Sequence, residues 1–173
     1  IKSNSPLHPA YEYLSLVHKS DYLRCYFMHH YGGGYTDIKK CRNSWVTAFN
    51  LINLNVDKWA LGYREVSEGG VVSLPGALGR DLKLNYISLI GNGGYIFQAD
   101  TPFTCEWLTE LHNRLDLYFG ALKECPGNIR GDNVGYPVPW SNILGDIFHP
   151  LSLKYSDKII QNMDVQPHLK DYM

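Results

Sequence analysis

The sequence predicts one α/β domain, in which a central mixed sheet is flanked by helices, and three observations support this prediction. The chain has 173 residues, 45% of them hydrophobic, which suits one compact domain spanning 1–173. Two long segments, 11–31 and 102–119, carry apolar residues at three- and four-residue steps, as helices do. Short strand-like runs are interspersed with these segments, an order typical of α/β folds.

The first half of the chain predicts two helices, a glycine turn and short strands. Within 11–31, Ser20 followed by Asp21 can cap a fresh helix, so two helices are expected to meet near Lys19. The glycines at 32–34 supply the backbone freedom that ends the second helix. The elements expected next are a strand at 35–38, a helix at 45–53 and strands at 59–64 and 71–74.

The second half predicts two strands, one long helix and a loop-rich end. Strand-like runs at 84–90 and 94–98 flank a glycine-rich turn around residues 91–94. Pro102 suits the first turn of the helix over 102–119. Its expected inner face consists of Phe103, Trp107, Leu111, Leu115 and Tyr118.

Composition narrows the functional classes. The formal net charge is -1, so the chain lacks an overall basic field for nucleic acid. No window approaches the roughly 18 consecutive apolar residues of a membrane span. Residues 1–10 do not resemble a signal peptide, and the four cysteines have no metal-ligand spacing, which favours reduced thiols. A cytoplasmic protein, expected to be monomeric, is the default.

The most informative segment runs from Ser20 to Lys39 and reads SDYLRCYFMHHYGGGYTDIK. Asp21 and Arg24 are three residues apart, so both project from one face near the start of a helix. The glycine turn allows close approach of a ligand to the backbone. Asp37 ends the following strand, where open α/β sheets bind ligands, and a carboxylate there can hold a ribose hydroxyl or a hard cation.

This segment resembles the donor-binding region of glycosyltransferases with the DXD motif. Their recurring pattern is S-D-x-x-R, an apolar helix, G-G-x-Y and D-x-D, and the family includes sugar-polymer transferases, Och1-like mannosyltransferases, clostridial glucosylating toxins and enzymes of large algal viruses. The composite match covers about a ninth of the chain and is far more specific than D-x-D alone. It is carried by Ser20, Asp21, Arg24, Gly33, Gly34, Tyr35 and Asp37.

The resemblance implies a GT-A fold, a nucleotide-diphosphate sugar donor and a divalent cation, Mn²⁺ or Mg²⁺. It implies that Asp21 and Arg24 bind hydroxyls of the donor sugar, and that Asp37 contacts ribose, sugar or metal. Gly33, Gly34 and Tyr35 complete the donor-binding segment. Domains of this fold begin with a strand and loop that hold the base, so the first strand is expected to lie outside this chain. A viral origin would place the protein in the host cytoplasm.

One departure from the pattern concerns the metal. Lys39 stands where the family has its second aspartate, and a lysine cannot ligate a cation but can pair with a diphosphate. Asp37 is then expected to hold the metal alone or through water. Alternatively, Lys39 is expected to replace part of the function of the metal. Many GT-A enzymes add a histidine from near the end of the domain, and His168 is the candidate here, with a surface histidine as the alternative.

Residues beyond this segment supply candidates for the sugar and the acceptor. In the family, the equivalent region lies beneath the donor sugar and the acceptor, so the resemblance implies this position for Asn92 and Gly94, unless 91–94 is only a hairpin turn. Trp140 could stack on an acceptor sugar beside Ser141, although tryptophan more often only packs. Asp132 and Asp146 are the carboxylates considered for acceptor contact or ion-pair stabilisation, with solvated loop acids as the alternative.

Together these features predict a glycosyltransferase that moves a hexose, from a donor expected to be UDP-linked, to a glycan or a protein-linked acceptor. Enzymes with this donor motif generally retain anomeric configuration, so retention is expected. A catalytically weak carbohydrate-binding or nucleotide-sugar-binding relative is the first alternative, favoured by Lys39. A nucleotidyltransferase is the second, but the basic glycine-rich loop it requires is missing from residues 1–10.

Overall fold

The computed structural model describes residues 1–41 and 43–168. Its sheet contains the strands β1 (Gly33–Thr36), β2 (Ala60–Arg64), β3 (Ile90–Phe97) and β4 (Ile159–Gln161), in the spatial order β1-β3-β2-β4. Strand β3 is antiparallel to both β1 and β2, whereas β2 and β4 are parallel. The sheet is therefore mixed, and the expectation of an α/β fold with a mixed sheet is confirmed.

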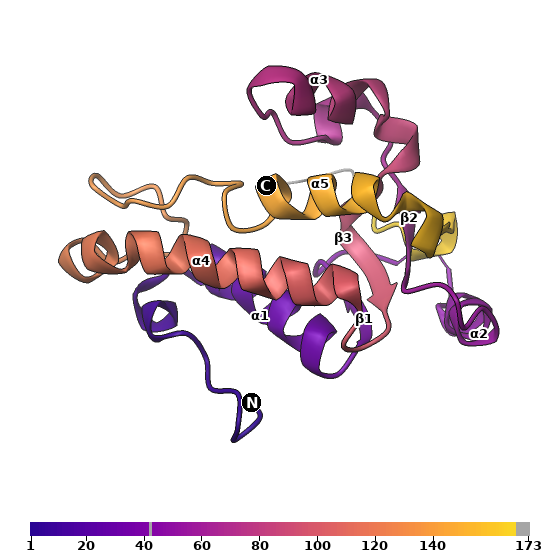
Figure 1. Ribbon diagram of the computed structural model, residues 1–173, viewed down its shortest axis with the longest axis horizontal. Coiled ribbons are helices and arrows are strands. Elements are labelled where there is room, and N and C mark those ends of the chain that lie inside the picture. Colours follow the sequence, from indigo (N-terminus) through magenta and orange to yellow (C-terminus); the bar gives the residue numbers. More distant parts are fainter. Residues whose placement is uncertain (42, 169–173) are drawn as a thin grey trace.

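Helices cover both faces of the sheet (Figure 1). On one face α1 (Leu16–His30), α4 (Pro102–Glu124) and α5 (Gly145–Lys154) share a core with Tyr95 and Phe97 of β3. On the other face α2 (Val46–Leu54) packs against Ile96, because successive strand residues point to opposite sides. Helix α3 (Gly76–Leu84) lies beyond α5. Short 3₁₀ segments occupy Pro9–Tyr13, Glu68–Gly70, Tyr86–Ser88, Ser156–Lys158 and Met163–Val165.

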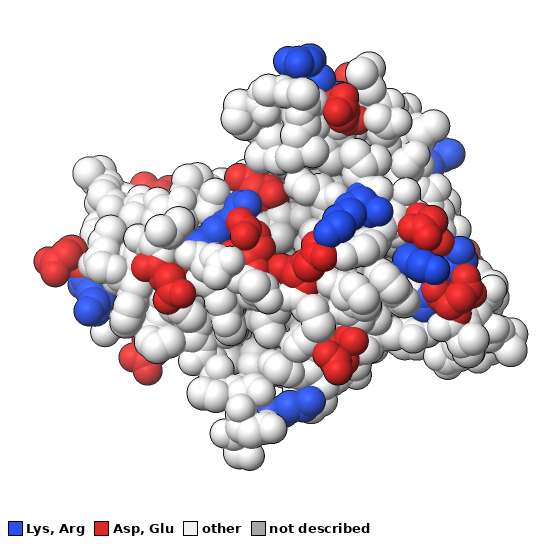
Figure 2. Space-filling model, viewed as in Figure 1, with Lys and Arg blue, Asp and Glu red and all other residues white. Residues whose placement is uncertain are grey.

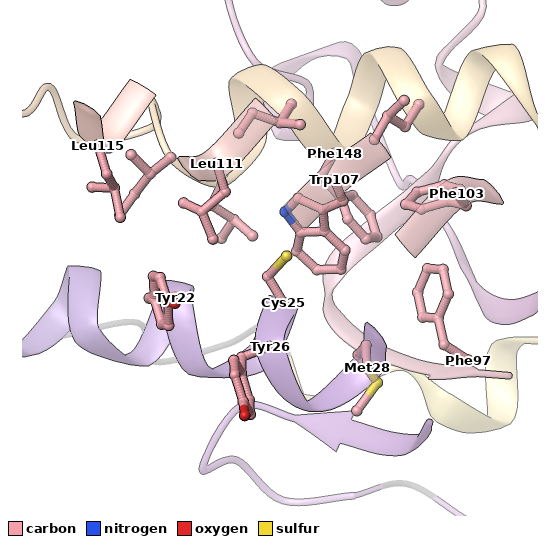
Figure 3. Packing of buried hydrophobic residues seen from close by; sticks show 14 of the residues in the cluster. Tyr22, Cys25, Tyr26, Met28, Phe97, Phe103, Trp107, Leu111, Leu115 and Phe148 are labelled. Atoms are coloured by element: carbon pink, nitrogen blue, oxygen red, sulfur yellow. The ribbon is translucent and has the colours of Figure 1, made fainter. Parts of the chain in front are cut away.

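The larger core joins the helices through aromatic side chains. Figure 3 shows Trp107 and Phe103 of α4 meeting Phe148 of α5, with Cys25 of α1 beneath Trp107. The ring centroids of Trp107 and Phe148 are 5.1 Å apart, and both residues are fully buried. Burial of aromatic groups of this size supplies much of the hydrophobic stabilisation of a domain. This core fixes α1, the helix that carries the acid–arginine pair.

The segment before β1 differs from the sequence prediction in one respect. A single helix, α1, runs through Lys19 and Ser20, so the expected break near Lys19 is wrong. The helix starts earlier because the Ser15 side chain accepts a hydrogen bond from the His18 backbone N–H (3.2 Å), which caps its first turn. The glycine stop is confirmed, since Gly32 has a φ of 65°, a conformation that favours glycine.

The expected glycine turn at 91–94 is also wrong, because β3 is continuous through these residues. Their glycines allow close packing within the sheet. A Cβ atom on Gly91 would lie 2.1 Å from the Tyr63 ring, and one on Gly94 would lie 2.4 Å from the Val165 carbonyl oxygen. Strands require such glycines where another chain segment approaches closely.

Other elements are confirmed or corrected in turn. The helices expected at 45–53 and 102–119 correspond to α2 and α4, and the strand expected at 59–64 corresponds to β2. Residues 71–74 form no strand, and α3, α5 and β4 were not predicted. No helix among the described residues has the length and apolarity needed to cross a membrane. On the face drawn in Figure 2, charged side chains of both signs are interspersed.

Candidate functional site

Helix α1 presents an acid–arginine pair on its buried side. Asp21 and Arg24 lie one helical turn apart, and Arg24 Nη2 is 3.0 Å from Asp21 Oδ1. The side chains are 5% and 9% exposed, so this ion pair is almost completely removed from bulk water. Buried charges are costly unless they are paired and hydrogen-bonded, so the surroundings of the guanidinium group decide whether the pair is tolerated.

The Arg24 guanidinium group joins α1 to two strands of the sheet. Its Nη1 donates a hydrogen bond to the Asn92 carbonyl oxygen on β3 (3.0 Å), and its Nη2 lies 3.8 Å from Asp37 Oδ1. Its Cζ atom lies 4.2 Å from the centroid of the Tyr35 ring on β1, a cation–π distance. Arg24 Nε has no hydrogen-bond partner among the described residues.

Asp37 follows β1 and is held by neighbours on both strands. The Tyr35 hydroxyl donates to Asp37 Oδ1 (2.8 Å), and the Asp37 backbone N–H donates to the Gly93 carbonyl oxygen (2.9 Å). A Cβ atom on Gly93 would lie 3.1 Å from Asp37 Oδ2, so this glycine leaves room for the carboxylate. We call Asp21, Arg24 and Asp37 the acid–arginine cluster.

Burial within this cluster affects proton binding. Loss of hydration raises the pKa of Asp21 to about 6, an effect that the Arg24 charge opposes and the Asp37 charge reinforces. A carboxyl group with its pKa near neutrality, beside an arginine and a second carboxylate, is typical of functional sites, although structural ion pairs also show such shifts.

The cluster lines a cavity of about 420 Å³, within the size range of small-molecule sites. Asn92 joins the cluster on one side of this cavity, and Trp140 and Ser141 line it as well. The structure therefore brings together six of the residues that the sequence singled out. The remaining lining residues are Val17, 69–73, Leu144, Gly145 and His149.

A buried histidine positions the Trp140 side of the cavity. His18, on the first turn of α1, is 1% exposed, and its two ring nitrogens lie 2.8 Å from the Tyr136 hydroxyl and 3.2 Å from the Trp140 carbonyl oxygen. Burial lowers the pKa of His18. The sequence carries no signal for this residue, because a single histidine in an apolar pattern has no distinctive spacing.

Two further residues near the cavity were missed. His149 lines it, accepts a hydrogen bond from the Val72 backbone N–H at Nδ1 (3.1 Å), and has Nε2 3.7 Å from Glu65 Oε1. A Cβ atom on Gly70 would lie 2.3 Å from Glu65 Oε2, so the 69–73 segment passes directly over the end of this side chain. The sequence offered one indication of Glu65, which is an acidic residue directly after the strand β2.

Several predicted residues lie outside this cavity. Gly33 has a φ of 93°, a conformation that favours glycine. Gly34 packs against Trp45, the residue before α2, and Gly94 packs against Val165. These glycines shape β1 and β3 and do not line the cavity among the described residues.

The two acidic candidates for the acceptor side also lie elsewhere. Asp132 is exposed and accepts a hydrogen bond from Asn128 Nδ2 (2.7 Å). Asp146 lines a larger cavity of about 730 Å³ together with Asn142 and Arg114, whose Nη1 is 4.0 Å from Asp146 Oδ2. Size alone does not decide between the cavities, and the larger one contains none of the acid–arginine cluster.

The side chains around Asp37 do not by themselves fit a divalent cation. Lys39 occupies the position where a second carboxylate is expected, and its backbone N–H donates to the Asp37 carbonyl oxygen (2.6 Å). Asp37 Oδ1 already accepts the Tyr35 hydroxyl and faces Arg24. Within the described chain, the three-ligand group that could hold a metal lies elsewhere, at His29, Asp100 and Cys105.

His168 lies on the segment that passes next to Asp37. The His168 backbone N–H donates to the Lys40 carbonyl oxygen (3.0 Å), and Pro167 forms a bridge with Cys41. A Cβ atom on Gly93 would lie 3.1 Å from Asp37 Oδ2 and also 3.3 Å from Pro167 Cγ, so Pro167 and Asp37 both lie close to Gly93. The role of His168 as a metal ligand therefore stays a prediction, and two ligands would not make a complete metal site. Lys170, a further phosphate candidate, lies outside the described residues.

Comparison of this chain with protein-family models, with curated proteins and with solved structures gave no match.

Proposed function

We propose that this chain is a GT-A glycosyltransferase domain that binds a nucleotide-diphosphate sugar at the acid–arginine cluster. The observation that carries the proposal is the convergence of Asp21 and Arg24, from α1, and Asp37, from the end of β1, on one cavity of about 420 Å³. A buried arginine between two carboxylates offers both donors and acceptors, which is the chemistry needed to hold several sugar hydroxyls in a fixed orientation.

The donor would be oriented by these groups and by the end of β1. In the proposed complex, Asp21 and Arg24 hold hydroxyls of a hexose, and Asp37 holds the ribose or the sugar. Lys39, two residues further on, carries a charge suited to the diphosphate. We infer a UDP-linked donor from the resemblance of residues 20–39 to the DXD family.

The reaction breaks the bond between the anomeric carbon and the diphosphate. Negative charge then grows on the leaving phosphate and positive charge on the sugar ring. Cationic side chains fixed in a water-poor site stabilise the leaving group, and such electrostatic stabilisation is usually the largest catalytic contribution. Arg24 and Lys39 are the cations that we assign to this role.

The acceptor would enter on the side of Trp140 and Ser141, which share the cavity with the cluster. Trp140 is 62% exposed, so its ring is accessible for stacking on a sugar. We infer a glycan or a protein-linked acceptor, and transfer with retention of anomeric configuration.

Hydrolysis of a panel of nucleotide sugars, followed by release of nucleotide, with and without Mn²⁺, tests this proposal. We expect turnover of at least one UDP-hexose by the natural chain and none by Asp37→Ala with its fold intact. Asp157→Ala is the matched control, because this carboxylate is 73% exposed and contacts only Lys158 among the ion pairs described. Equal turnover by Asp37→Ala would refute the assignment.

The same assay separates the alternative of a catalytically weak binding relative. Calorimetric titration with the donor would then show binding that Asp37→Ala loses, while no nucleotide is released from any member of the panel. Dependence of turnover on Mn²⁺ would show that the donor diphosphate recruits a cation when it binds.

A further inference from the structure

Three chemically different side chains meet at the end of α1, away from the acid–arginine cluster. His29 lies on the last turn of α1, Asp100 on the connection between β3 and α4, and Cys105 on the first turn of α4. One nitrogen, one carboxylate oxygen and the sulfur of these residues all lie within 4.8 Å of one another. Sequence spacing does not reveal this group, because His29 and Asp100 lie far apart along the chain.

The backbone at Asp100 adopts a conformation that is uncommon for a residue with a side chain. Its φ is 54°, and it is the only non-glycine residue with a positive φ in the described part of the chain. The Asp100 backbone N–H donates to the His29 carbonyl oxygen (2.9 Å), and Cys105 Sγ lies 3.6 Å from Asp100 Oδ1. Such conformations persist where surrounding contacts enforce them, and they cluster at functional sites.

The His29 ring is oriented by a neighbour that is not itself a ligand. Its Nδ1 is 3.3 Å from Thr104 Oγ1, a hydroxyl that donates to the Thr101 carbonyl oxygen (3.0 Å). In the tautomer in which Nδ1 carries the ring proton and donates it to Thr104, the other ring nitrogen keeps its lone pair. Metal-binding histidines commonly use one ring nitrogen in this way, so that the second is fixed as a ligand.

We propose that His29, Asp100 and Cys105 bind a divalent cation of the zinc class. Imidazole nitrogen, thiolate sulfur and carboxylate oxygen are the three ligand types that zinc accepts, and water would complete a four-coordinate site. The cation would join the end of α1 to the start of α4. It would thereby hold the helix that carries Asp21 and Arg24, and this role does not depend on the proposed glycosyl transfer.

Titration of the reduced protein with Co²⁺ tests the ligand set, because a cobalt–thiolate bond produces a charge-transfer absorption band in the near ultraviolet. We expect a band that saturates at about one Co²⁺ per chain, disappears on addition of Zn²⁺, and is lost in Cys105→Ser. Cys125→Ser is the matched control, since Cys125 is also half-buried but lies outside the group, and it should keep the band. Absence of the band from the natural chain, or its persistence in Cys105→Ser, would overturn the proposal.

Thermal unfolding with and without Zn²⁺ provides a second readout. Asp100→Gly removes a ligand and places glycine at a positive φ, so this variant should fold at least as well as the natural chain without metal. We expect Zn²⁺ to raise the Tm of the natural chain and of Cys125→Ser but not that of Asp100→Gly. An equal rise in Asp100→Gly would also overturn the proposal.

Discussion

Replacement of Asp21 by asparagine distinguishes a carboxylate retained for ligand binding from one that serves as a structural partner of Arg24. The asparagine side chain has nearly the same shape as the aspartate side chain. Like the protonated acid, it lacks the negative charge of the ionised carboxylate. Arg24 would keep its hydrogen bond to the Asn92 carbonyl oxygen and its approach to Asp37. The substitution therefore isolates the free-energy cost of ionising Asp21 inside the protein.

The size of this free-energy cost follows from the difference between the pKa of Asp21 in the folded and in the unfolded state. Burial raises the pKa of Asp21 to about 6 from an ordinary value of 3.8. Between these pH values the folded state keeps a proton that the unfolded chain has lost, so the free energy of unfolding decreases as the pH rises through this window. A difference of about two pH units corresponds to about 3 kcal/mol, which remains as a constant cost above the folded pKa.

Urea unfolding of the natural chain and of Asp21→Asn between about pH 4 and 7.5 measures this cost as a difference. We expect the variant to be more stable by up to about 3 kcal/mol at pH 7.5, and the difference to vanish toward pH 4. Turnover of the donor should be lost at the same time, a trade of function for stability. The control Asp157→Asn, at an exposed position, should change stability by less than about 0.5 kcal/mol.

The opposite outcome would refute this reasoning. If Asp21→Asn were less stable than the natural chain at both ends of the pH range, the carboxylate would be a net stabilising partner of Arg24. Its burial would then require no explanation from ligand binding.

Three further substitutions test parts of the account. Gly94→Ala places a Cβ atom 2.4 Å from the Val165 carbonyl oxygen, a backbone atom, so we expect a loss of about 1–3 kcal/mol in unfolding experiments, and unchanged stability would contradict the close approach of Val165 to β3. Tyr35→Phe removes the hydroxyl that donates to Asp37, and we expect weaker donor binding in calorimetry with at most about 1.5 kcal/mol lost in stability. Trp107→Ala empties the centre of the larger core and should cost about 3–5 kcal/mol, whereas a cost below about 1 kcal/mol would show that this core is loosely packed.

The acid–arginine cluster was predictable because its three residues lie close together in the sequence. Asp21 and Arg24 are one helical turn apart, and the glycine stop determines where Asp37 follows, so the segment from Ser20 to Lys39 carries most of the geometry. Periodicity also located α4, whose apolar residues repeat over many turns. These features depend on spacing along the chain, which a sequence displays directly.

Features that depend on tertiary contacts were not predictable. The glycines at 91–94 look like a turn, but they lie in β3 because Tyr63 and Val165 approach the strand there. His149 and Glu65 are in contact although they lie far apart in the sequence, and the residues around each of them do not indicate this contact. The acidic residues Asp132 and Asp146 were singled out for their loop-like surroundings, which do not specify the cavity they face.

Binding of a donor in a crystal tests the central claim most directly. In crystals soaked with a UDP-hexose, we predict sugar hydroxyls within hydrogen-bond distance of Asp21 and Arg24, and the diphosphate beside Asp37 and Lys39. A donor bound instead in the cavity that contains Asp146 and Arg114, with the cluster unchanged, would contradict the account.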